Sequence, residues 1–160
     1  MADERTARDT PPDGTLRTLG RVALGGLLAL AGTGHLTFAR DEFQAQVPSW
    51  VPLDTDLVVV GSGVAEIALG AALVVAPRRY RPWVGAAAAA FFVVVFPGNV
   101  AQYVEGKDGF GLDTDAKRLA RLPFQALLVV WALWCTGAWR AWRTARARRR
   151  PAAPASDGRR

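Results

Sequence analysis

The chain has 160 residues, of which 51% are hydrophobic and 21% are charged, and its formal net charge is +6. This length predicts one domain, and the charges gather in the tails and in the loops between four long apolar runs. A single cysteine, Cys135, excludes an intrachain disulfide, and a single histidine, His35, excludes a bis-histidine haem or a multi-histidine metal site within one chain. No phosphate-binding loop, dinucleotide fingerprint, Ser-His-Asp pattern or CxxC motif occurs, so we expect no metal site and no self-contained catalytic motif.

Residues 1–15 are charged and rich in Thr, Asp and Pro, which predicts a disordered arm. The first apolar run, residues 16–38, is long enough to cross the hydrocarbon core of a bilayer as a helix. Its glycines would weaken a helix in water, but in a membrane they permit close contacts between helices. The loop at residues 39–56 interleaves charged residues with prolines and Trp50, a mixture that is typical of a segment at the membrane interface.

The second apolar run, residues 57–76, carries no charge except Glu66, which lies close to its middle. As a helix this run is about 30 Å long, which is the thickness of the hydrocarbon core. A carboxylate at that depth is costly unless it is protonated, paired or facing a polar cavity. We therefore expect the other predicted helices to supply Glu66 with a partner or a polar cavity.

The last two apolar runs complete the predicted bundle. Residues 83–104 contain Pro97-Gly98-Asn99, where a kink would free backbone carbonyls inside the bundle. Residues 119–139 begin with a polar turn and end among tryptophans, and a basic tail follows at residues 143–160. The chain is thus predicted to be an all-α integral membrane four-helix bundle over residues 16–142, with short loops and disordered termini.

The lysines and arginines divide unevenly between the two sides that four spans would create, with fifteen on the side of the termini and five on the other. The positive-inside rule then predicts cytoplasmic termini and a multi-pass protein of the plasma (inner) membrane. We expect the arginine-rich tail to attract anionic lipid headgroups. Basic charge also suits nucleic acid, but no binding fold accompanies it in this sequence, so no nucleic-acid partner is expected.

Polar residues from all four predicted helices fall in the same outer half of the membrane, whereas the inner half is nearly all apolar. Residues three or four apart share one face of a helix, which groups these side chains together. We therefore expect an outward-opening polar pocket with Glu66 at its floor, where Arg121 could reach down and hold Glu66 ionised. Glu66 is the best candidate for a catalytic role. The candidate ligand-binding residues are His35, Ser62, Glu66, Asn99, Gln102, Tyr103, Arg121 and Gln125.

Each of these side chains also has a purely structural interpretation. Glu66 could be protonated and hydrogen-bonded to a neighbouring helix, although a carboxyl inside a membrane is functional by default. His35 could cap or pack at the interface. Asn99 could repair the helix that Pro97 interrupts, and Arg121 could extend toward the outer headgroups instead of binding a ligand.

Several short motifs resemble, in the same order, those of the DoxX-like membrane proteins. They are Gly34-His35, Phe43, Val47-Pro48, Pro52, Ser62-Gly63, Glu66-Ile67, Gly70, Pro77-Arg78-Arg79, Phe96-Pro97-Gly98-Asn99, Arg121-Leu122-Pro123 and Gln125. The resemblance covers residues 17–140, and the ordered series is more specific than any single motif. It implies a four-helix membrane bundle, with relatives linked to oxidoreductase complexes and to quinone-linked sulfur oxidation.

The resemblance implies an accessory or redox-linked subunit that binds a quinone or a similar amphiphile in the polar pocket. Glu66 and His35 would exchange protons with the ring oxygens, and Asn99 and Gln125 would donate hydrogen bonds. Electrons would come from an oxidoreductase partner, because the sequence shows no redox cofactor motif. Four short helices also enclose little volume, which favours a homo-oligomer or a larger complex. The alternative is a non-enzymatic membrane scaffold, lipid binder or small transporter, in which the polar residues form a structural hydrogen-bond network.

Overall fold

Residues 14–148, which the computed structural model describes, form helices and short connections and contain no strand. In chain order the helices are α2 (Thr15–Leu36), α3 (Arg40–Gln44), α4 (Thr55–Val75), the 3-10 helix η1 (Arg78–Tyr80), α5 (Arg81–Val104), α6 (Asp115–Cys135) and α7 (Ala138–Arg148). Within this part of the chain, α2, α4, α6 and the continuous η1–α5 segment are each long and apolar enough to cross a membrane. The predicted all-α four-helix membrane bundle is confirmed.

Most of the helices begin and end a few residues from their predicted limits, and polar caps account for the early starts of α4 and α6. α4 begins at Thr55, since the Asp54 side chain accepts a hydrogen bond from the Leu57 amide at 2.9 Å. α6 begins inside the predicted polar loop, where Thr114 accepts from the Lys117 amide. α5 runs as one helix through Pro97 to its end at Val104.

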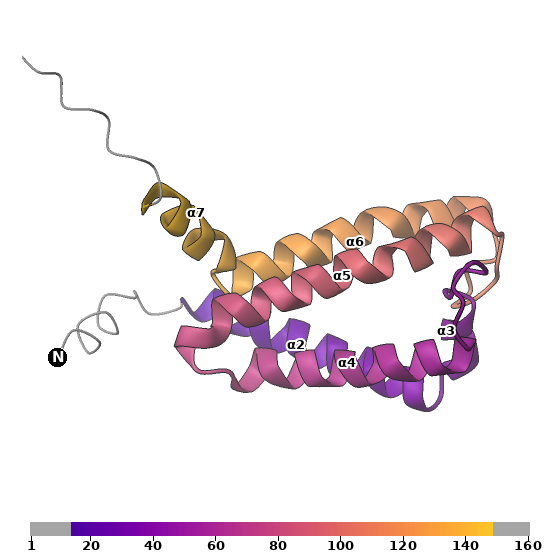
Figure 1. Ribbon diagram of the computed structural model, residues 1–160, viewed down its shortest axis with the longest axis horizontal. Helices are drawn as coiled ribbons and strands as arrows, with labels where there is room; N and C mark the ends of the chain where they lie inside the picture. Colours follow the sequence, from indigo (N-terminus) through magenta and orange to yellow (C-terminus); the bar gives the residue numbers. More distant parts are fainter. Residues whose placement is uncertain (1–13, 149–160) are drawn as a thin grey trace, which may run out of the picture.

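The two ends of the chain lie mostly outside the described residues. Residues 1–13 of the expected disordered arm and residues 149–160 of the basic tail belong to that part. The first residues of the tail, 143–148, continue α7 instead. α7 leaves the end of α6 at an angle (Figure 1), directly after Gly137, whose positive φ of 74° suits glycine and turns the chain.

The four spanning helices form two layers, with α2 packed along α4 and α5 packed along α6 (Figure 1). Fewer contacts join one layer to the other. The short helix α3 lies at the end of the bundle opposite α7 (Figure 1). The molecule is therefore two helix pairs that are each tightly packed and that are joined more loosely to each other.

Glycines bring α2 and α4 unusually close. A methyl group added at Gly32 would lie 2.5 Å from the Gly63 carbonyl oxygen, and one added at Gly25 would lie 2.8 Å from the Gly70 carbonyl oxygen. The contacts are reciprocal, because a methyl group at Gly63 or Gly70 would meet the carbonyl oxygen of Gly32 or Gly25 at 2.9 Å and 2.6 Å. Small residues of this kind let two helices in a membrane pack backbone against backbone.

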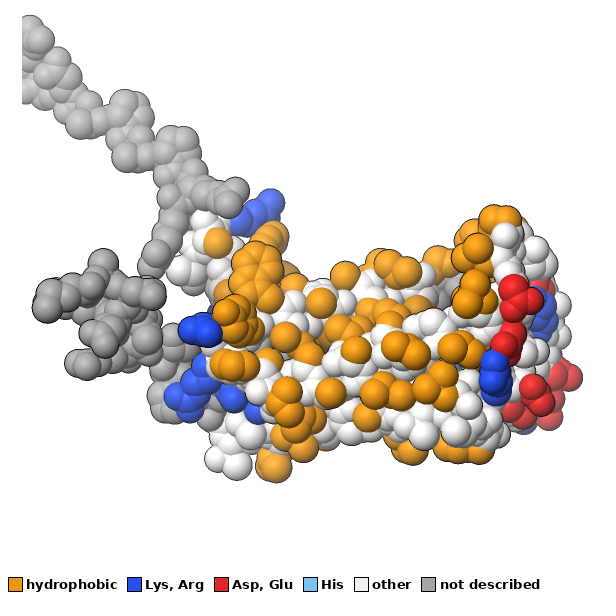
Figure 2. All heavy atoms as spheres, turned by 60° about the horizontal axis from the view of Figure 1, so that its bottom comes forward, with side chains coloured by type: hydrophobic (Ala, Val, Ile, Leu, Met, Phe, Trp, Pro, Cys, Tyr) orange, Lys and Arg blue, Asp and Glu red, His pale blue; other side chains and the backbone are white. Residues whose placement is uncertain are grey.

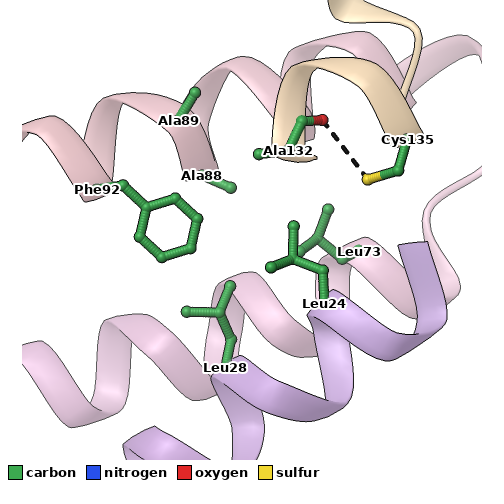
Figure 3. Packing of buried hydrophobic residues seen from close by; sticks show 8 residues of the cluster. All are labelled: Leu24, Leu28, Leu73, Ala88, Ala89, Phe92, Ala132 and Cys135. Carbon is green, nitrogen blue, oxygen red and sulfur yellow. Dashed lines mark hydrogen bonds between the residues drawn. The ribbon is translucent and has the colours of Figure 1, made fainter. Parts of the chain in front are cut away.

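The apolar core joins the two layers in the half of the bundle that is nearer to α7. It consists of Leu24, Leu28, Leu73, Ala88, Ala89, Phe92, Ala132 and Cys135 (Figure 3). These residues come from α2, α4, α5 and α6, and the Cys135 thiol donates a long hydrogen bond of 3.6 Å to the Ala132 carbonyl oxygen. Because this core fills only one half of the space between the layers, the other half is left for polar residues.

Charged side chains mark the two ends of the bundle, and apolar side chains cover much of the visible face between them (Figure 2). We call one end the arginine end; it holds Arg17, Arg21, Arg78, Arg79, Arg81, Arg140, Arg143 and Arg146. We call the other the acidic end; it holds Asp41, Glu42, Asp54, Asp56, Glu105, Asp108, Asp113 and Asp115. Exposed leucines, valines and phenylalanines along the sides are the surface that a lipid environment solvates.

Candidate functional site

A cavity of about 560 Å³ lies between the two layers, and its walls come from all four spanning helices and from the segment after α3. Its volume is in the range of pockets that hold small organic ligands, and most of its lining is apolar. Six of the eight predicted ligand-binding residues line it: His35, Ser62, Glu66, Asn99, Arg121 and Gln125. The structure therefore brings together most of the polar residues that helical spacing had grouped.

His35 and Glu66 face each other across the contact between α2 and α4. His35 Nε2 lies 3.6 Å from Glu66 Oε2, and the two side chains are only 8% and 12% exposed. Both of these atoms are buried without a hydrogen-bond partner. A buried polar atom without a hydrogen-bond partner costs free energy. His35 Nε2 and Glu66 Oε2 can therefore each form a hydrogen bond to a further group.

The other side of the His35 ring is firmly held. Its Nδ1 lies 2.8 Å from Ser62 Oγ and 3.1 Å from the Val59 carbonyl oxygen. Ser62 donates its own hydroxyl proton to that carbonyl at 2.9 Å, so the serine oxygen is free to accept from Nδ1–H. This network assigns the proton of the neutral ring to Nδ1 and leaves the lone pair of Nε2 directed toward Glu66.

The close contact of α2 with α4 is the reason that His35 and Glu66 meet. A methyl group added at Gly63 would lie 2.6 Å from His35 Cβ, and one added at Gly32 would lie 3.0 Å from Glu66 Cβ. Each titratable residue thus sits over the glycine of the opposite helix. Larger residues at these two glycines would separate the helices and the pair with them.

On the opposite layer, two amides connect α5 with α6. Asn99 Nδ2 donates to Gln125 Oε1 at 3.1 Å, and Gln125 Nε2 donates to the Phe92 carbonyl oxygen at 2.5 Å. Both side chains are buried. The sequence predicted that these amides donate hydrogen bonds to a ligand. In the structure they also link α5 to α6, because each of them already donates to a group of the protein.

Arg121 differs from the expectation that it would hold Glu66 ionised. Its Nη1 donates to Gln102 Oε1 at 2.9 Å, and its guanidinium lies 5.7 Å from the centre of the Phe110 ring. Among residues 14–148, the ion pairs found include none between Arg121 and a carboxylate, and the ionisable neighbour of Glu66 is His35 instead. Arg121 lines the same cavity from the other layer, so its remaining N–H groups belong to the site.

Gln102 and Tyr103 do not line the cavity, although they share a helical face with Asn99. Gln102 is fully buried between Arg121 and the loop before α6, where its Nε2 donates to the Gly109 carbonyl oxygen at 3.5 Å. Tyr103 is partly buried farther toward the end of α5. Helical spacing alone could not predict this, because the loop at residues 105–114 covers that part of the face.

α3 and the segment after it form a cap over the cavity, which the candidate residues did not include. Phe43 of α3 and Gln46 and Trp50 of the following segment line the cavity, and Gln46 Nε2 is buried without a partner. The Phe43 ring lies against the His35 ring, with 3.4 Å between the ring centres. Prolines and a tryptophan interleaved with charges were the sequence signal for this segment, and they indicated an interface position but not a cavity wall.

Contacts with the loop at residues 105–114 hold the cap in place. Lys107 Nζ donates to the Val47 carbonyl oxygen at 2.9 Å, and Ser49 Oγ donates to Glu105 Oε1 at 3.0 Å. The Phe110 amide donates to the Glu42 carboxylate. The hydrogen bond from Lys107, together with those from Ser49, lowers the pKa of Glu105 below its ordinary value.

The cavity reaches the side of the bundle between α4 and α5. Gly61 on α4 and Val94 on α5 both line it and are exposed on the outer surface, as is Trp50 of the cap. In a membrane this side faces hydrocarbon. Among residues 14–148, no group of three or more His, Cys, Asp or Glu side chains is placed to hold a metal ion.

The fold and the cavity together define a multi-pass membrane protein whose four-helix bundle encloses a largely apolar pocket with polar walls. The family described as Domain of unknown function (DUF8561) matches residues 24–136, and the chain belongs to this family. The matched residues include every polar residue of the cavity. No curated protein and no solved structure matches the chain.

Proposed function

We propose that this chain is an accessory membrane protein that binds a quinone or a similar amphiphile in the cavity between its two layers. The observation that carries the proposal is the distribution of unsatisfied atoms. Four buried side-chain polar atoms lack a partner among the described residues, and three of them belong to residues that line this cavity: His35 Nε2, Gln46 Nε2 and Glu66 Oε2. Native proteins leave few buried polar atoms unpaired, so their gathering at one place indicates a bound group that satisfies them.

The rest of the cavity suits a flat, mostly apolar head with a few oxygen atoms. Phe91, Phe92 and Trp50 offer aromatic surface, while the polar atoms of His35 and Arg121 lie on opposite layers. An opening between α4 and α5, where Gly61 and Val94 line the cavity and are exposed, would admit such a molecule from the bilayer without passage through water. The DoxX-like motifs point in the same direction, because they imply a subunit of a quinone-linked oxidoreductase complex. In that role a partner protein supplies or accepts the electrons.

The alternative is a non-enzymatic scaffold, lipid binder or small transporter, and one observation favours it. On the α5–α6 layer the polar side chains already satisfy one another, through the bonds of Asn99 to Gln125 and of Arg121 to Gln102. That part of the site is a hydrogen-bond network which needs no ligand. The unsatisfied atoms of the α2–α4 layer and the cap are what favour ligand binding.

We further propose that the arginine end faces the cytoplasm of a cell whose plasma (inner) membrane holds the protein. The arginines of this end are the positive charge that the positive-inside rule places there. α7 would then lie at anionic lipid headgroups, with its arginines near phosphate and its stacked Trp139 and Trp142 rings, 5.4 Å apart, at the interface.

Lipid extraction from the purified protein tests the proposed ligand. The wild-type protein, isolated in mild detergent, should retain quinone, counted in its oxidised and reduced forms together, above the level in a micelle sample of equal lipid content. Glu66→Leu should reduce the retained quinone about tenfold, since it removes the carboxyl group from the site. Val64→Leu is the matched control, because Val64 lies on the same helix and its side chain is exposed outside the cavity. Wild-type protein in which neither the quinone nor its reduced quinol form is enriched would contradict the proposal.

A further inference from the structure

The two unsatisfied atoms at the contact of α2 with α4 limit which chemical groups can bind beside them. His35 Nε2 and Glu66 Oε2 are 3.6 Å apart, which is too long for a hydrogen bond between them. Both residues line the cavity, and the two side chains are almost completely removed from the surface. We call these two residues the His35–Glu66 pair. What satisfies it has to lie in the cavity, within reach of both atoms.

The proton count of the pair sets the chemistry of its ligand. Nδ1 of His35 is engaged by Ser62 and Val59 and carries its own proton, so only Nε2 is left for a further hydrogen bond. When one further proton is shared between Nε2 and Oε2, one of these atoms is a donor and the other is an acceptor. This holds whether the proton sits on the imidazole or on the carboxyl. The pair therefore presents a donor and an acceptor side by side.

A hydroxyl oxygen is the group that complements such a pair. It can accept from one atom and donate to the other, and it can reach both, because 3.6 Å is less than twice an ordinary O–H···O distance of about 2.8 Å. A carbonyl or ether oxygen only accepts, so it would leave the acceptor of the pair buried and unsatisfied. Phe43 covers the face of the His35 ring, which leaves the ring edge as the approach.

We propose that the His35–Glu66 pair selects amphiphiles with a free hydroxyl on the head group, such as phenols and quinols, over their methyl ethers and quinones. The inference rests on the proposed function, since it names the ligand class of the same cavity. A water molecule has the same hydrogen-bonding capacity and would occupy the position before a ligand enters. A ligand hydroxyl reproduces the bonds of that water when it displaces it, whereas an ether oxygen does not and loses affinity.

The test compares two probes that differ only at this oxygen, para-octylphenol and its methyl ether, para-octylanisole. Full-length protein in lipid nanodiscs is dialysed to equilibrium against empty nanodiscs of the same lipid, so that simple partition into lipid cancels. We expect the phenol to be enriched on the protein about tenfold more than the ether. Glu66→Leu should abolish this preference, while Glu66→Gln should keep it, since an amide also offers a donor and an acceptor. Val64→Leu should match the wild type.

The outcomes separate the inference from the proposed function. Equal enrichment of phenol and ether would overturn hydroxyl selection and leave amphiphile binding standing. Enrichment of neither probe would overturn both. A preference that survives in Glu66→Leu would show that another part of the cavity makes the selection. The comparison of the two probes on wild-type protein decides the question even if a variant fails to insert.

Discussion

At the scale of single residues, Glu66 shows how a carboxyl is accommodated at mid-membrane depth. Its ionisable neighbour is His35 on the adjacent helix, at 3.6 Å, and not the arginine on the opposite layer. Arg121 is held by Gln102 and by the Phe110 ring. The site therefore has two separate polar walls, one with a histidine beside a carboxyl and one that carries a fixed positive charge.

Glu105 makes the cap sensitive to acid. Its pKa is lowered by Lys107 and Ser49, so its contribution to stability is complete above its ordinary pKa of 4.5 and is lost as the pH falls through the lower value of the folded protein. Glu105→Gln should reduce the melting temperature near neutral pH, because an uncharged amide pairs less well with Lys107. The difference from wild type should shrink as the pH is lowered from about 6 to about 3. Thermal unfolding of both proteins over this range measures it, and a constant difference would contradict the assignment.

At the scale of helices, the glycine contact between α2 and α4 is the most sensitive feature. Gly32→Ala adds a methyl group 2.5 Å from a backbone oxygen that cannot move aside as a side chain would. We expect a loss of about 1–3 kcal/mol in stability, together with weaker ligand binding, because the His35–Glu66 pair depends on this contact. Unfolding in mixed detergent micelles measures the first effect and probe dialysis the second.

Gly26→Ala is the matched control for this substitution. Gly26 lies on the same helix, but a methyl group added there meets no atom within 4 Å. Its effect should be neutral or stabilising by up to about 1 kcal/mol, because alanine is the better helix former. Equal destabilisation by the two substitutions would show that the α2–α4 contact is looser than the structure has it.

The existence and type of the four long helices could be predicted from the sequence, whereas their ends could not. Length and hydropathy are local properties of each apolar run, and they define a span in any bundle. The start of α6 within a polar stretch depends on a single cap at Thr114. α7 likewise begins at the end of the predicted fourth run and continues into the expected basic tail, where arginines conceal the helical pattern.

At the scale of the whole molecule, charge separates the two ends of the bundle. Every described Asp and Glu other than Glu66 lies at the acidic end, and the arginine end faces the opposite way. If the arginine end is cytoplasmic, the loop before α6 faces the outside. This orientation follows from the whole arrangement of spans and can be measured on intact cells.

Single-cysteine labelling tests the orientation. In a Cys135→Ala background, Asp113→Cys places a thiol at the acidic end and Arg79→Cys places one at the arginine end, both at exposed positions. A membrane-impermeant maleimide should label only the Asp113→Cys protein on intact cells, and both proteins once the membrane is opened. The reverse pattern would require the opposite orientation.

The sequence by itself determined that the chain crosses a membrane four times and that its polar residues gather in one half of the bundle. Both conclusions depend only on the order of apolar and polar residues along each run. The tertiary structure alone decided which of these residues meet. Gly32 and Gly63 let α2 approach α4 closely enough to bring Glu66 to His35, while the loop at residues 105–114 draws Gln102 and Arg121 together. The partner of a side chain depends on how helices pack, which helical spacing within one helix does not specify.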